Sequence, residues 1–153
     1  MELPIIEFRG KRLDNGEWVY GNLVSDGKRY FIIYDNDITE STRYGERYIE
    51  ASRYFEVDPK TIGQCTGVKD CKRTVKYSKG QPIYVGDIVI VNYGLKDRKE
   101  NIINEQNCKG YLAIIKFEDG MFTHGWCEPE LNGERLYVIG NIHDSPELLE
   151  VEE

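Results

Sequence analysis

The sequence lacks the features by which membrane-spanning, secreted and zinc-binding proteins are recognised. No stretch of the 153 residues approaches the roughly 18 consecutive apolar residues of a membrane helix, and the first residues do not begin a signal peptide. The four cysteines are separated by 6, 37 and 19 positions, which matches no structural zinc pattern. We therefore expect a cytoplasmic protein with no membrane association, reduced cysteines and no bound metal.

One metal-binding alternative can be drawn from these residues. His124 stands three positions before Cys127, and the two could be combined with Cys65 and Cys71. Structural zinc sites usually present pairs of ligands separated by two residues, and these residues are not spaced in that way. Ordinary thiols, buried or exposed, are the favoured interpretation.

Catalytic signatures are also scarce. The only histidines are His124 and His143, and the sequence has neither a glycine-rich phosphate loop nor a serine elbow. Asp87, Asp119 and Asp144 could be taken for a carboxylate cluster, but each lies in a turn motif that explains it without catalysis. We predict no catalytic residue and no cofactor, and an enzyme of unrecognised type is the less favoured alternative.

Positive charge is not in excess, since 20 Lys and Arg stand against 27 Asp and Glu, for a net charge of −7. Residues 1–80 hold 14 bases and 13 acids (+1), whereas residues 81–153 hold 6 bases and 14 acids (−8). A protein this acidic is a poor general nucleic-acid binder, because its field repels phosphate. The sequence ends in an acidic tail, which is most simply a solvated end: Glu147, Glu150, Glu152 and Glu153.

One segment departs from this acidity. Residues 69–79 carry five basic side chains and one acidic side chain, for a local charge of +4. Such a loop would contact the phosphates of a nucleic acid, although a solvated β-hairpin extension explains the same composition. The candidate nucleic-acid-binding residues are Lys69, Lys72, Arg73, Lys76, Tyr77 and Lys79.

Signals for β-structure are abundant. The dipeptides at 15–16, 26–27 and 119–120, Asn-Gly or Asp-Gly, favour tight turns, and the run Ile88–Val91 behind Gly86-Asp87 predicts a buried strand. Apolar content collapses over residues 35–46, where we expect a loop. Strands are predicted over residues 5–12, 17–24, 29–34, 48–57, 61–66, 87–93, 111–117, 121–126 and 136–140.

These strands fall into two groups. Asp58-Pro59 marks the boundary between them, because a proline holds the preceding residue in extended conformation. We predict a mainly β protein with an N-terminal antiparallel meander in residues 1–58. It is packed on an SH3-like small β-barrel in residues 59–153, which ends in a short helical turn and the acidic tail.

Tyrosine is over-represented, with 11 copies. Four aromatic residues of the meander could form a platform for a partner or for self-association: Trp18, Tyr20, Tyr30 and Tyr34. Filling a thin β core is the more usual role of such residues. We expect aromatic side chains on one face of the meander and aliphatic side chains on the other. Because the barrel can cover only one of these faces, the other is left for a second subunit, which predicts a homo-oligomer.

Four blocks of this sequence resemble, in order and over almost the whole chain, the YopX family of phage and prophage proteins. They lie at residues 8–21, 57–67, 83–89 and 138–149, and residues 71–82 are longer than the short turn usual in the family. The resemblance implies a protein encoded in mobile phage DNA, in a family without an assigned activity. We therefore expect a phage or prophage accessory protein of the host cytoplasm that acts by binding or self-assembly rather than catalysis. It would associate with itself or with a protein partner, and a nucleic-acid-associated module using residues 69–79 is the alternative.

Overall fold

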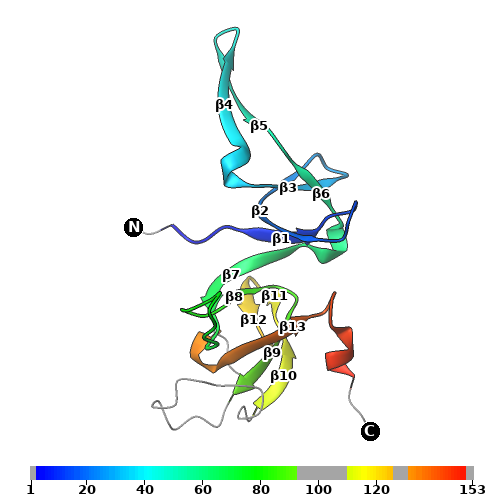
Figure 1. The fold of residues 1–153 in the computed structure, drawn as a ribbon, viewed down its shortest axis with the longest axis vertical. Helices are drawn as coiled ribbons and strands as arrows, with labels where there is room; N and C mark the ends of the chain where they lie inside the picture. Colours follow the sequence, from blue (N-terminus) through cyan, green and yellow to red (C-terminus); the bar gives the residue numbers. More distant parts are fainter. Residues whose placement is uncertain (1–2, 93–109, 126–130, 151–153) are drawn as a thin grey trace. The chain divides into compact units, whose positions relative to one another are not determined.

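The computed structural model describes residues 3–92, 110–125 and 131–150 and forms two compact units, Met1–Gln64 and Cys65–Glu153 (Figure 1). Strands account for 52% of the structure and helical turns for 10%, so the chain is mainly β, as predicted. Every pairing between the described strands is antiparallel. None of the described helical turns has the length and apolar character to cross a membrane.

The N-terminal unit is built on one antiparallel sheet in the order β6-β3-β2-β1-β7. The predicted turns at residues 15–16 and 26–27 join its first three strands. The strands are β1 (Phe8–Lys11), β2 (Trp18–Ser25), β3 (Tyr30–Ile33), β6 (Phe55–Val57) and β7 (Gly63–Lys69).

One face of this sheet forms the core of the unit. Val19, Ile32 and Val57 are buried at its centre, and each buried aliphatic side chain of this size contributes about 1.5–3 kcal/mol. Gly10 is on the same face, where a Cβ would lie 2.9 Å from the Cβ of Val57. Partly buried side chains surround the centre: Phe8, Leu23, Tyr30, Tyr34, Phe55 and Ile62.

A two-stranded hairpin projects from this sheet (Figure 1), and we call it the arm, residues 38–51. It consists of β4 (Ile38–Arg43) and β5 (Glu46–Ala51), and it follows the short 3-10 turn η1 (Asp35–Asp37). The expectation of a loop over residues 35–46 is wrong. β-branched residues and a favourable turn form a ribbon here without the alternation of apolar residues by which half-buried strands are recognised.

Strand β7 continues from the N-terminal unit into the C-terminal unit. Its first two residues pair with β1, and its remainder pairs with β8 (Pro82–Tyr84). The 3-10 turn η2 (Pro59–Thr61) precedes it, where the Asp58 carboxylate accepts a hydrogen bond from the backbone N–H of Lys60 at 3.0 Å. The predicted boundary at residue 58 falls at this turn, whereas the two units divide after Gln64.

The C-terminal unit contains three sets of paired strands. In one, β9 (Asp87–Asn92) lies between β10 (Gly110–Ile114) and β13 (Leu136–Asn141). In the second, β11 (Lys116–Glu118) and β12 (Met121–Thr123) form a hairpin at the predicted turn of residues 119–120, and in the third β7 pairs with β8. The unit also contains the 3-10 turns η3 (Gly133–Arg135) and η4 (Pro146–Leu149).

The predicted strand behind Gly86-Asp87 is the buried centre of this unit. Val89 and Val91 pack in one cluster with Ile83, Ala113, Ile115, Leu136 and Val138. The buried carboxylate of Asp87 accepts a hydrogen bond from the backbone N–H of Tyr84 at 2.8 Å, which fixes the turn that leads into β9. In the described part of the chain, no sheet closes into a barrel.

Candidate functional site

The predicted basic loop connects β7 to β8, and a single buried carboxylate organises it. Asp70 is 2% exposed. Its Oδ1 accepts hydrogen bonds from the backbone N–H groups of Lys72 at 3.0 Å and Gln81 at 2.8 Å, and its Oδ2 accepts one from Val138 N–H at 3.0 Å. One carboxylate therefore fastens both ends of the loop to each other and to β13.

Further hydrogen bonds hold the interior of the loop. Thr74 N–H donates to the carbonyl of Tyr77 at 3.1 Å, and Tyr77 N–H donates back to the Thr74 hydroxyl at 2.9 Å. Gly80 closes the loop with a φ of 103°. A Cβ at this position would lie 2.3 Å from the carbonyl oxygen of Asp70. Glycine is required here both for its conformation and for the close approach of the backbone.

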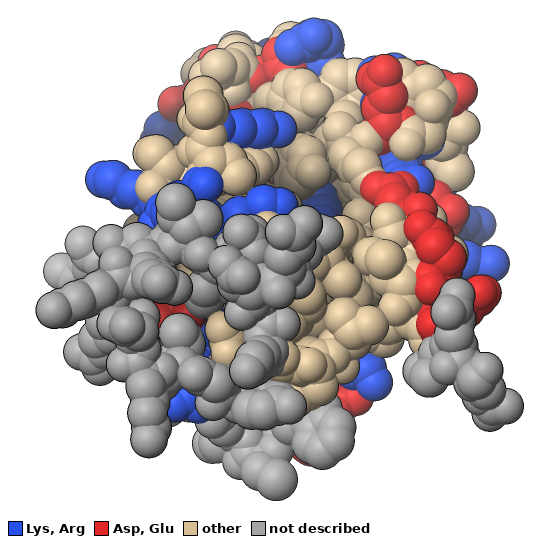
Figure 2. All heavy atoms as spheres, turned by 60° about the horizontal axis from the view of Figure 1, so that its bottom comes forward, with Lys and Arg blue, Asp and Glu red and all other residues tan. Residues whose placement is uncertain are grey.

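The six residues predicted to bind nucleic acid lie together on this loop. Lys69, Arg73, Lys76 and Lys79 are exposed, and Lys72 is half-buried. None of these five cations forms an ion pair with a carboxylate of the described residues. Figure 2 shows several exposed Lys and Arg side chains on the side of the molecule turned to the viewer.

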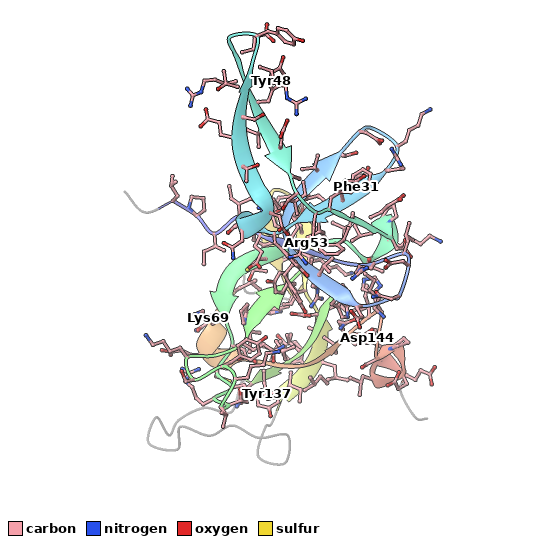
Figure 3. The ribbon with its side chains drawn as sticks, turned by 45° about the horizontal axis from the view of Figure 1, so that its top comes forward. Phe31, Tyr48, Arg53, Lys69, Tyr137 and Asp144 are labelled. Carbon is pink, nitrogen blue, oxygen red and sulfur yellow. The ribbon has the colours of Figure 1, made fainter. Side chains whose placement is uncertain are left out.

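Two of these cations lie over aromatic rings. The Lys76 ammonium is 5.2 Å from the ring centre of Tyr77, and the Lys72 ammonium is 5.0 Å from that of Tyr137. Figure 3 labels Lys69 at the end of β7 and Tyr137 on β13. Tyr137 was not predicted, because it follows Lys72 by 65 positions and only the pairing of the strands brings the two together.

The structure divides the predicted aromatic platform between two faces of the N-terminal sheet. Trp18 and Tyr20 stand opposite Lys11 and Arg9 in the β1–β2 register, so these four share a face. The Arg9 guanidinium lies 4.7 Å and the Lys11 ammonium 5.4 Å from a ring centre of Trp18. Tyr30 and Tyr34 belong instead to the core face, against the cluster described above.

The arm is a surface that the sequence did not indicate. Its turn is formed by Tyr44 and Gly45, whose φ values of 52° and 77° match a two-residue type I′ turn. The Tyr44 side chain is fully exposed at the tip. Ile49 is 73% exposed on β5, and Figure 3 shows Tyr48 towards the same end of the arm.

Exposed ion pairs connect the two strands of the arm, and a buried carboxylate anchors its base. Arg43 pairs with Glu50 at 2.8 Å across the strands on one face, and Arg47 pairs with Glu40 on the other. At the base, the buried Asp37 carboxylate accepts hydrogen bonds from two groups. These are the Ser52 hydroxyl at 3.1 Å and the Arg53 Nε–H at 3.2 Å, and Figure 3 labels Arg53 there.

The polar residues considered for metal binding or catalysis have structural surroundings. Cys65 is buried, the Sγ of Cys71 lies 3.0 Å from the carbonyl oxygen of Leu136, and Cys108 and Cys127 lie outside the described residues. No group of three or more His, Cys, Asp or Glu side chains gathers among the residues that are described. Asp119 forms the β11–β12 turn with a φ of 52°, and Asp144 accepts a hydrogen bond from the Asn141 amide.

The protein thus consists of two antiparallel β units, of which the N-terminal one carries the arm and the C-terminal one carries the basic loop. The family model described as YopX protein matches residues 7–150, so the chain belongs to the YopX family. The crystal structure of protein EF1440 from Enterococcus faecalis is similar, with a TM-score of 0.59 and 25% sequence identity over 97% of this chain and 100% of that chain. No curated protein matches the chain.

Proposed function

We propose that this chain is a phage or prophage accessory protein of the host cytoplasm that acts by binding a second copy of itself rather than by catalysis. Membership of the YopX family supports the proposed phage origin, because this family is one of phage and prophage proteins. The arm is the observation that carries the proposed mode of action.

Both long edges of the arm are open. Within the described residues β4 pairs only with β5, so each strand has one edge whose backbone groups pair with no other strand. An open strand edge is a template for another strand. A two-stranded ribbon alone is also only marginally stable in water. Association that pairs or covers the arm would therefore stabilise it.

The charge of the arm does not oppose a second copy as the partner. Residues 38–51 contain three acids and two bases, for a charge of −1, although the whole chain carries −7. Two copies that meet at their arms thus bring together segments of small net charge, so electrostatic repulsion between the arms is weak. The exposed side chains of Tyr44 and Ile49 supply apolar surface for the contact, and twofold symmetry would close the assembly.

Light scattering after size-exclusion chromatography tests this proposal with two matched variants. Ile49→Lys changes the arm, and Ile6→Lys changes an isoleucine of nearly equal exposure, 68% against 73%, outside it. We expect the wild type and Ile6→Lys to exceed the monomer mass of 17.8 kDa at micromolar concentration and Ile49→Lys to return to it. A wild type that stays at 17.8 kDa at every concentration would contradict the proposal, as would dissociation by Ile6→Lys alone.

For the C-terminal unit we propose the SH3-like barrel as the complete fold, with the turn at Pro146–Leu149 as its helical end. One core cluster takes side chains from β8, β9, β10 and β13, which supports a common interior for the short sheets. Nuclear Overhauser contacts between the edge strands of these sheets test it, and their absence would favour an open arrangement.

A further inference from the structure

We propose that the loop of residues 69–79 is a separate binding site for the phosphodiester backbone of a nucleic acid. The first argument is that its cations are available. Five of them occur within 11 positions, and none forms an ion pair with a described carboxylate. By contrast, five arginines of the N-terminal unit, Arg12, Arg29, Arg43, Arg47 and Arg53, each have a carboxylate partner.

The second argument is that the loop is held in shape before any ligand arrives. The only acid within it, Asp70, is buried and directs its carboxylate at three backbone N–H groups. It therefore orders the loop and presents little negative charge at the surface. Arg73 is also held, because its Nη1 donates to the Asp70 carbonyl at 3.1 Å. A preformed loop loses less conformational entropy on binding than a flexible one.

The acidity of the whole chain does not prevent this contact. At physiological ionic strength the interaction between exposed charges decays over about 8 Å, so a local cluster of like charge acts on a ligand that touches it. The net charge of −7 lowers the affinity at longer range, and we expect weak binding that requires low salt.

The surroundings of the loop favour backbone contacts over base recognition and over a membrane. Tyr137 is only 6% exposed, and the ring of Tyr77 is partly buried and lies beside the Lys76 ammonium, so the loop presents little aromatic surface for stacking on a base. Val75 is the one fully exposed apolar residue of the loop. A single valine buries too little surface for stable membrane attachment, which usually needs an acyl chain or an apolar helix face.

Fluorescence anisotropy with a labelled 20-base-pair DNA duplex of arbitrary sequence, titrated at several salt concentrations, tests the proposal. Each phosphate contact changes the slope of log K against log salt by about −0.9, so Lys76→Gln/Lys79→Gln should reduce its magnitude by about 2. The same variant should bind about tenfold or more weakly at roughly 50 mM salt. Lys28→Gln/Lys60→Gln is the control, because both lysines are exposed in the N-terminal unit and the net charge changes equally.

We expect the control to bind as the wild type does and a second duplex of different sequence to bind equally well. Equal weakening by both double variants would overturn the proposal, because net charge alone would then explain binding. So would a wild type that does not bind the duplex at low salt, or one that binds vesicles containing anionic lipid and not the duplex.

Discussion

Replacement of Asp70 by alanine should destabilise the C-terminal unit far more than its position beside a surface loop suggests. The substitution removes three hydrogen bonds to a carboxylate, from the backbone N–H groups of Lys72, Gln81 and Val138. Hydrogen bonds to charged groups contribute about 1.5–3 kcal/mol each, and a buried donor left without a partner costs its desolvation energy. The N–H of Val138 is in the buried interior, whereas those of Lys72 and Gln81 are partly buried and can be rehydrated.

We therefore expect Asp70→Ala to lower the free energy of unfolding by about 3–5 kcal/mol, less than the sum of three separate bonds. Asp70→Asn should lower it less, because its carbonyl oxygen still accepts from the two loop amides while its NH₂ group faces Val138 N–H. The measurement is the urea midpoint followed by circular dichroism. A loss below about 1 kcal/mol for the alanine variant would refute the account of Asp70 as the residue that fastens the loop.

Three further predictions follow from local geometry. Gly80→Ala should destabilise the protein more than Gly27→Ala in thermal unfolding, because both have positive φ but only a Cβ at Gly80 meets a backbone oxygen, at 2.3 Å. Ile32→Ala should cost about 2–5 kcal/mol in urea, since Ile32 is fully buried in the N-terminal core. Hydrogen bonds from the backbone N–H groups of Arg29 and Lys28 lower the pKa of Asp26, so the pKa measured for Asp26 by NMR titration should lie below the usual aspartate value. Its stabilising contribution is present above that value and is lost as pH falls through the lowered pKa.

The sequence was most informative where turn chemistry and burial agree. The Asp119-Gly120 hairpin and the buried strand after Asp87 were predicted because their signals are local: two residues that accept positive φ, and a β-branched run with no polar break. The cationic loop was also recognisable, since its residues are close together in the sequence. The role of Asp70 was not, because one of its three donors, Val138, lies 68 positions away.

The arm shows why other features could not be predicted. Its strands bury no face, so Ile38–Arg43 has no apolar alternation from which a strand could be inferred, and only Tyr44-Gly45 marks the turn. The predicted aromatic platform could not be placed from the sequence for a similar reason. Trp18 and Tyr20 are two positions apart in one strand and share a face as expected. Whether Tyr30 and Tyr34 lie on that same face depends on the pairing between strands. That pairing is a property of the folded sheet.

Hydrogen exchange of the arm amides, followed by mass spectrometry at low and high protein concentration, tests self-association through the arm most directly. Pairing or covering of its open edges should slow exchange in peptides from residues 38–51 as the concentration rises, while peptides from residues 69–79 stay unchanged. Exchange of the arm that is equally fast at all concentrations would contradict the proposal that the arm binds a second copy of this chain.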